Sequence, residues 1–140
     1  MKKYKLGYTQ GTFDVFHVGH LNLLENAKGF CDTLIVGVNS DELVQTYKNV
    51  KTIISEKDRC RIVSSIKVVD DAFIVNTLDK LDVFSKIKFD VIFVGDDWIN
   101  NQRWIKTKED LGKIGVDVIF LPHTSGISSS IIRNKISNNK

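Results

Sequence analysis

Two of the three histidines in the sequence, His17 and His20, lie in one short segment that begins at Gly11. Because they are three residues apart, we expect both on the same side of a helix start, where the positive end of the helix dipole also points. Two imidazole donors beside a helix amino terminus form a site for an anion such as phosphate. Metal ligation is the weaker interpretation, because the helical HExxH spacing is missing.

Two glycines of this segment have predicted tasks. Gly11 permits a tight exit from a preceding strand, and Gly19 lets the following helix approach closely at its start. The segment contains neither the Rossmann GxGxxG fingerprint nor the Walker GxxxxGK[ST] pattern. A phosphate ligand would therefore be held here by a different set of groups.

A second candidate anion site is the run SGISSS at residues 125–130. Gly126 allows an otherwise strained backbone, and Ser128 and Ser129 supply hydroxyls and free amides at a helix start. An ordinary serine N-cap is the alternative interpretation. Asp96 directly follows the apolar run VIFVG, where its carboxylate can either reach a ribose hydroxyl or a base amino group or cap a helix.

Five short runs rich in Val, Ile, Leu and Phe predict the strands that position these groups: Tyr4–Thr9, Thr33–Asn39, Val68–Val75, Val91–Gly95 and Val116–Leu121. Helical patterns fill the intervals: His20–Phe30, a helix starting at Ser55, Leu78–Ile87, Trp104–Ile114 and Ser128–Ile136. This alternation predicts an α/β fold, a Rossmann-like doubly wound parallel sheet of five strands. Ligands of such sheets bind beyond the carboxyl ends of the strands.

Composition excludes several classes of protein. The 140 residues, 42% hydrophobic and 26% charged, without a linker or repeat, predict a single domain over residues 1–140. A formal net charge of +3 is too small and too dispersed for a nucleic-acid or membrane partner. Cys31 and Cys60 form no CxxC pair, and no apolar run has the length of a membrane span. We therefore expect a cytoplasmic protein.

The string GTFDVFHVGH at residues 11–20 resembles the GTFDxxHxGH signature of the cytidylyltransferase-like nucleotidylyltransferases. Further matches follow in the family's order along nearly the whole chain: VNSDE at 38–42, SEKDR at 55–59, VDD at 69–71, GDDW at 95–98 and TSGISS at 124–129. Within this family, the presence of both GDDW and TxGIS makes the sequence similar to the glycerol-3-phosphate cytidylyltransferases. The resemblance implies the HxGH type of fold, a homodimer, and Mg²⁺ bound with CTP.

The resemblance also implies a reaction and its residues. A phosphate oxygen of a small acceptor, glycerol 3-phosphate or a related polyol phosphate or phosphonate, attacks the α-phosphorus of CTP, and pyrophosphate leaves. The implied catalytic residues are His17, His20, Lys48 and Ser129. The implied nucleotide-binding residues are Gly11, Thr12, Phe13, Gly19, Lys48, Arg59, Lys67, Asp96, His123, Gly126, Ile127, Ser128 and Ser129. Asp14 and Lys67 are implied to face the acceptor. The alternatives are solvated surface for Lys48 and an ordinary ion pair for Arg59.

Two positions depart from the family pattern. Lys67 and His123 stand where the glycerol-3-phosphate enzymes have arginines, and neither exchange is conservative at a phosphate site. The departures bear on the identity of the acceptor more than on the class of reaction. Two alternatives remain: an adenylyltransferase of the same fold, and a nucleotide-binding protein that has lost turnover.

Overall fold

The computed structural model describes residues 2–138 and contains one five-stranded sheet. Its strands are β1 (Tyr4–Gly11), β2 (Cys31–Asn39), β3 (Asp71–Val75), β4 (Val91–Gly95) and β5 (Asp117–Leu121). They lie in the order β3-β2-β1-β4-β5, and every neighbouring pair is parallel. The predicted doubly wound parallel sheet of five strands is confirmed.

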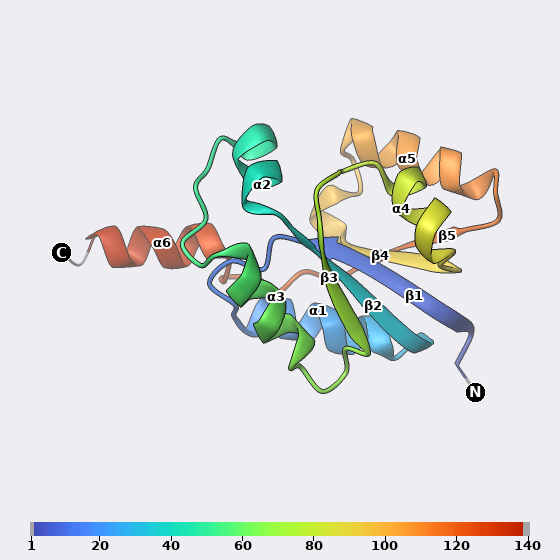
Figure 1. The fold of residues 1–140 in the computed structure, drawn as a ribbon, viewed down its shortest axis with the longest axis horizontal. Helices are drawn as coiled ribbons and strands as arrows, with labels where there is room; N and C mark the ends of the chain where they lie inside the picture. Colours follow the sequence, from blue (N-terminus) through green and yellow to red (C-terminus); the bar gives the residue numbers. More distant parts are fainter. Residues whose placement is uncertain (1, 139–140) are drawn as a thin grey trace.

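Helices cover both faces of the sheet. They are α1 (Val18–Lys28), α2 (Asp41–Lys48), α3 (Glu56–Ser64), α4 (Lys80–Ile87), α5 (Gln102–Gly112) and α6 (Ser129–Asn138), with a 3-10 turn η1 (Asp96–Trp98). Figure 1 shows α1 and α3 against one face, α4 and α5 against the other, and α6 extending away from the sheet. The chain changes faces in the connection from β3 through α4 to β4, and the strand order reverses between β1 and β4, which is the switch point where such folds bind ligands.

Two apolar cores lie on the two faces of the sheet. Alternate side chains of β2 pack into the two different cores. Leu34 and Val36 pack toward α1 and α3, whereas Ile35 packs with Tyr8 and the residues of α4 and α5. Successive strand side chains point to opposite faces, so a strand covered on both sides is apolar throughout. This explains the nearly continuous apolar runs in the sequence.

Most elements lie within about two residues of their predicted bounds, and the largest departures are β3 and α2. Strand β3 begins at Asp71 rather than Val68, because Val69 N donates to Ile66 O in a turn that ends the preceding helix. Helix α2 was not predicted, since it buries only Val44. Its start nevertheless carries a signal, because Ser40 caps it by accepting from Leu43 N at 3.0 Å.

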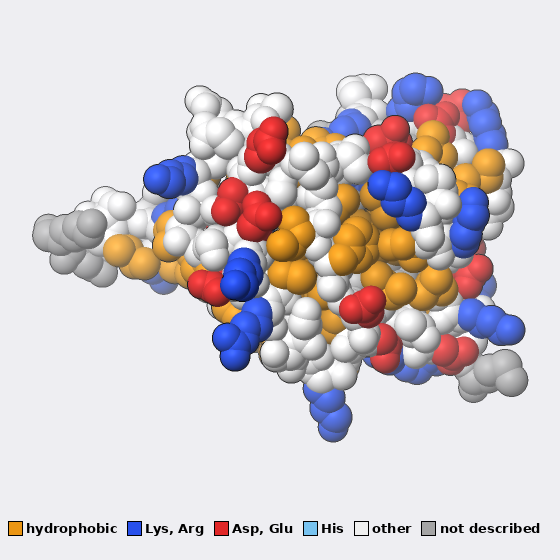
Figure 2. All heavy atoms as spheres, in the orientation of Figure 1, with side chains coloured by type: hydrophobic (Ala, Val, Ile, Leu, Met, Phe, Trp, Pro, Cys, Tyr) orange, Lys and Arg blue, Asp and Glu red, His pale blue; other side chains and the backbone are white. Residues whose placement is uncertain are grey.

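The edge strand β3 is partly open to solvent. Figure 2 shows hydrophobic side chains gathered over it, and Ile74 of this strand is 41% exposed.

Within residues 2–138, no helix has both the length and the apolar character needed to cross a membrane.

Candidate functional site

A cavity of about 460 Å³ opens at the carboxyl ends of the strands, as the fold class predicts. Most of the predicted site residues line it: Gly11, Thr12, Phe13, Asp14, His17, Gly19, His20, Lys48, His123, Ile127, Ser128 and Ser129. Four other predicted residues, all within the described part of the chain, lie outside its lining: Arg59, Lys67, Asp96 and Gly126. The loop after β1 and the start of α6 thus meet at one site.

His17 and His20 form the capping box of α1. His17 is the N-cap residue, and its Nδ1 accepts from Gly19 N at 3.0 Å, while His20 Nδ1 accepts from His17 N at 3.2 Å. The two rings stack with their centroids 3.8 Å apart. Because each Nδ1 accepts a hydrogen bond, we assign the proton of each neutral imidazole to Nε2. Each ring therefore has one N–H left to donate to a ligand.

The environment keeps both imidazoles neutral. Burial lowers the pKa of His17, and burial followed by the nearby His17 lowers the pKa of His20 to about 3. Lys48, the last residue of α2, lies close enough to lower the pKa of His20 as well. The pair is therefore suited to bind phosphate oxygens as neutral N–H donors, with the lysine as the cation beside them.

The predicted task of Gly19 fits the packing at this position. A Cβ atom there would lie 2.8 Å from His17 Cε1 and 3.0 Å from His17 Nδ1. Any larger residue would push the imidazole away from the amide that it caps. The loop before the helix is itself strained, because Phe13 and Val15 have φ angles of 56° and 49°. Such angles cost about 1–3 kcal/mol each and persist only where the surroundings fix them.

Asp14 holds this strained loop in place. Its buried carboxylate accepts from Ile53 N at 2.8 Å, from Ile54 N at 2.9 Å and from the guanidinium of Arg133 at 2.7 Å. Burial alone would raise the pKa of Asp14, but the two amides and Arg133 lower it on balance. These contacts show that the carboxylate positions the loop, while Asp14 also lines the cavity, so its predicted contact with the acceptor stays a prediction.

Arg59 also has a different place from the predicted one. Its side chain is fully buried and donates to Ile54 O, Thr12 O, Asn39 O and the Asp41 carboxylate at 2.6–2.9 Å. It therefore ties the carboxyl ends of β1 and β2 together beneath the cavity. The predicted contact with nucleotide is corrected to this supporting role, because the guanidinium neither lines the cavity nor reaches solvent.

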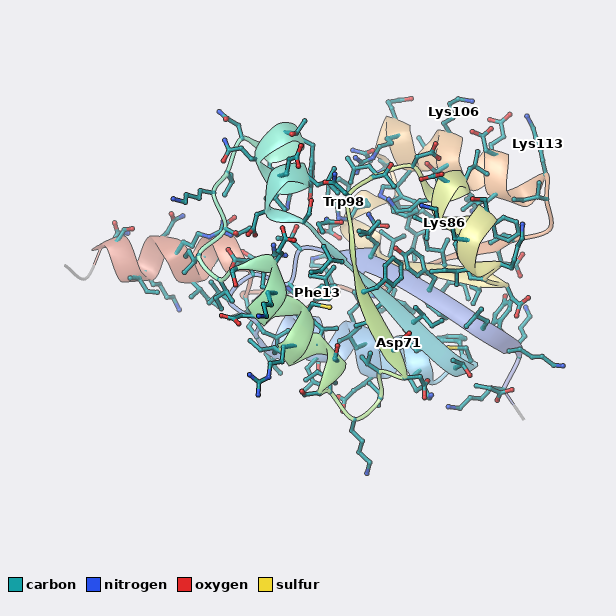
Figure 3. All side chains as sticks on the ribbon, in the orientation of Figure 1. Phe13, Asp71, Lys86, Trp98, Lys106 and Lys113 are labelled. Carbon is teal, nitrogen blue, oxygen red and sulfur yellow. The ribbon has the colours of Figure 1, made fainter. Side chains whose placement is uncertain are left out.

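Lys67 lies far from the predicted site. It is exposed in the segment between α3 and β3. That segment leads into the amino end of β3, and Figure 3 labels Asp71 there, at the opposite end of the sheet from Trp98. Within one chain, the predicted contacts of Lys67 with nucleotide and acceptor are therefore wrong.

His123 and Asp96 are paired with each other. His123 Nδ1 lies 2.5 Å from Asp96 Oδ1, and His123 N donates to the same oxygen at 3.2 Å. The hydrogen bond to Asp96 and its charge raise the pKa of His123. The pair joins the ends of β4 and β5, and of the two residues only His123 lines the cavity.

The serine run starts α6 beside the β1 loop. Ser128 Oγ accepts from Ile131 N at 3.1 Å, so the N-cap interpretation holds for this residue. Ser129 Oγ donates to Asp14 O at 2.5 Å, which commits its proton to the loop. Gly126 lies outside the cavity but has φ 80°, the positive value that lets the chain turn into the helix. The free amides at this helix start remain available to an anion.

Several cavity residues were missed from the sequence. They are Asn39 and Tyr47 near Thr12, and Lys80, Trp98, Arg103 and Trp104 on the side of α4 and α5. Asn39 could have been found, because it ends a predicted strand at the edge where ligands bind. The others lie on helices and turns, where only the packed structure shows which side chains meet.

A family model described as cytidylyltransferase-like matches residues 8–135 of the chain. The chain belongs to the cytidylyltransferase-like family. A glycerol-3-phosphate cytidylyltransferase of Bacillus spizizenii is 38% identical to it over 130 residues, which are 92% of this chain and 95% of that relative. A bifunctional protein HldE of Hyphomonas neptunium is 32% identical over 129 residues. That match covers 91% of this chain but 26% of HldE, so the chain spans about a quarter of this relative.

Solved structures of other proteins have a similar fold. A lipopolysaccharide core biosynthesis protein from Thermoplasma volcanium matches with a TM-score of 0.72 and 26% identity, covering 86% of this chain and 97% of that one. Pantoate–β-alanine ligase from Francisella tularensis matches with a TM-score of 0.61 and 17% identity, over 99% of this chain and 70% of that one. The latter similarity shows the fold alone. In this fold class ligands bind at the carboxyl ends of the strands, where the cavity lies.

Proposed function

We propose that this cytidylyltransferase-like protein transfers CMP from CTP to a small phosphorylated acceptor, releasing pyrophosphate and forming a CDP-linked product. The acceptor is glycerol 3-phosphate or a related polyol phosphate or phosphonate. The main support is the pair of capped imidazoles, each with a free Nε2–H, on the cavity beside Lys48 and the start of α6. The Bacillus relative, matched over nearly its full length, supports the choice of CTP and acceptor.

The arrangement fits an in-line displacement without a protein nucleophile. The acceptor's phosphate oxygen forms a bond to the α-phosphorus as the bond to the leaving pyrophosphate breaks. His17 and His20 donate to the α-phosphate region, where negative charge grows in the transition state. Lys48 and the amides at the start of α6 hold the departing pyrophosphate. Removing one such fixed donor typically costs about 3 kcal/mol of transition-state stabilisation, or on the order of a hundredfold in rate.

Mg²⁺ is expected with a triphosphate substrate, where it neutralises phosphate charge. The best oxygen-rich group among the described residues is Asp96, Asp97 and His123, with one ligand atom of each within 4.8 Å of the others. Asp96 is already paired with His123, which leaves Asp97 as the free carboxylate beside the cavity. This set fits an ion that is held mainly by the substrate's phosphates and at most one carboxylate.

An assay of pyrophosphate release tests the proposal. The purified protein is incubated with CTP or ATP and with glycerol 3-phosphate, a heptose phosphate or pantetheine phosphate. We expect release with CTP and a small polyol phosphate. Pyrophosphate release with ATP and an acceptor, but not with CTP, would make the protein an adenylyltransferase. Binding of nucleotide without pyrophosphate release from any combination of nucleotide and acceptor would identify a protein that has lost turnover.

A further inference from the structure

Two cations that have no ion-pair partner among the described residues line the cavity from α4 and α5, on other elements than the histidines. Lys80 begins α4 and Arg103 lies in α5, and both also line a second cavity between those helices that adjoins the first. Figure 3 shows Trp98, whose ring lies 5.7 Å from the Arg103 guanidinium, on the α5 side of the sheet. The family resemblance assigned no role to either cation.

Lys80 is unusual because its charge is buried. The residue is 6% exposed, and its ammonium lies 5.2 Å from the centre of the Trp104 ring. It donates one hydrogen bond, to Leu78 O at 2.8 Å, and has no other protein acceptor among the described residues. An ammonium has three donors, so two remain unused in a place where water is largely excluded.

Neighbouring carboxylates do not neutralise this pair. Asp79 accepts from Leu81 N and Asp82 N as the N-cap of α4, and Asp110 pairs with Lys106 at 3.4 Å. No ion pair involves Lys80 or Arg103 in the described part of the chain. Burial lowers the pKa of Lys80, and Arg103 lowers it further, while the charge of Asp79 has a weaker opposite effect. Burial of the Lys80 charge and its repulsion from Arg103 are both unfavourable in the free protein, and an anionic ligand would offset both.

The placement relative to the histidines says which anion this is. The imidazoles line the cavity from the start of α1, whereas Lys80 and Arg103 line it from α4 and α5, which Figure 1 shows against the opposite face of the sheet from α1. In-line transfer needs the attacking phosphate and the leaving pyrophosphate on opposite sides of the α-phosphorus. Two anions that approach from opposite sides need separate cations.

We infer that Lys80 and Arg103 bind the phosphate of the acceptor and orient it for attack on the nucleotide. This inference rests on the proposed function, because it names the groups that hold the second substrate of that reaction. It also supplies the contact with the acceptor's phosphate that was predicted for Lys67. Lys67 does not line the cavity, and the Asp14 carboxylate is held by Ile53 N and Arg133. Acceptors without a phosphate, phosphonate or similar anion are then poor substrates.

The test separates the two substrates kinetically. Lys80→Met and Arg103→Met remove the charges while keeping much of the side-chain length, and Lys86→Met, exposed on α4 and outside both cavities, is the matched control. We expect each of the first two variants to raise the KM for glycerol 3-phosphate about tenfold or more and to leave the KM for CTP within about twofold. The control should match the wild type in both constants.

A binding measurement keeps the inference testable apart from turnover. Glycerol 3-phosphate is titrated by calorimetry into protein saturated with the α,β-methylene analogue of CTP, which cannot transfer CMP. Binding that is lost in Lys80→Met but kept in Lys86→Met supports the inference even if the wild type proves inactive. Equal binding of glycerol 3-phosphate by Lys80→Met and Lys86→Met would overturn it. So would a KM for CTP that rises as much as the KM for the acceptor in Lys80→Met and Arg103→Met.

Discussion

The guanidinium of Arg133 on α6 donates to the buried carboxylate of Asp14 at 2.7 Å and so joins the last helix to the loop before α1. Ser129 strengthens this connection by donating to Asp14 O. The two halves of the candidate phosphate site therefore share one support. Their relative position depends on contacts that themselves need not touch substrate.

Arg133→Met should loosen this support. The variant leaves the Asp14 charge buried with only backbone amides as partners, which costs on the order of 2 kcal/mol of stability. Because Asp14 has a lowered pKa in the fold, its contribution is full above about pH 4 and is lost as the pH falls further. Urea unfolding at pH 7 and pH 3 measures both effects. A stability difference between wild type and variant that is equal at the two pH values would contradict the assigned role.

Arg59→Met should lower stability by about 3 kcal/mol or more, because the variant loses four hydrogen bonds of a fully buried guanidinium, including its ion pair with the half-exposed Asp41. For a chain of this size the Tm falls by about 10 °C. Arg61→Met, exposed on the same helix, is the control and should leave the Tm nearly unchanged. An Arg59→Met variant with normal Tm and a raised KM for CTP would restore the interpretation made from sequence.

Arg59 illustrates what sequence could and could not predict. The five apolar runs and their alternation with helical patterns predicted the sheet. A doubly wound fold buries both faces of its strands, so each strand is a nearly continuous apolar run in the sequence. The spacing of His17 and His20 likewise placed both at one helix start. A motif arginine, by contrast, looks the same whether it binds a phosphate or four protein oxygens. Only the packed structure separates those cases.

The same limit applies to Lys80 and Lys67. Both are lysines near predicted element boundaries, yet one is buried on the cavity and the other is exposed at the far end of the sheet. Their distinction depends on contacts between segments distant in the chain, such as Lys80 over Trp104. Local patterns carry no information on such contacts.

Lys80→Met should make the protein more stable at pH 7, by about 2 kcal/mol, because it removes a buried charge. Burial and then Arg103 lower the pKa of Lys80 to about 8, while Asp79 acts weakly in the opposite sense. In the wild type the destabilisation is full below about pH 8 and is relieved as the pH rises toward the unfolded value near 10.4. Urea unfolding at pH 7 and pH 10 tests this. A less stable variant at pH 7 would show that Lys80 serves the fold instead.

The KM for CTP should depend on His123 between about pH 6 and 8.5, if its charge helps to hold the triphosphate. The hydrogen bond to Asp96, and then the charges of Asp96 and Asp97, raise the pKa of His123. The imidazolium therefore persists to higher pH than usual and is lost as the pH rises through that raised value. His17 and His20 have lowered pKa values and stay neutral across this range. The assay is run at saturating acceptor, so that the titration of Lys80 does not enter.

Two variants decide the role of His123. His123→Arg keeps a positive charge at every pH and should give a low, flat KM for CTP. His123→Gln carries no charge and should give a high, flat one. Identical pH profiles in wild type and both variants would mean that His123 does not contact the nucleotide.

The most direct test of the whole account is the kcat of pyrophosphate release from CTP in His17→Asn and His20→Gln. Asparagine at the N-cap and glutamine at the third helical position preserve the capping box, so each variant removes an imidazole N–H and keeps the helix start. Glu25→Ala, exposed on α1, is the control. We predict a kcat at least about a hundredfold below wild type in both variants, with the Tm retained. Wild-type kcat in either variant would contradict the claim that this histidine pair stabilises the transferring phosphate.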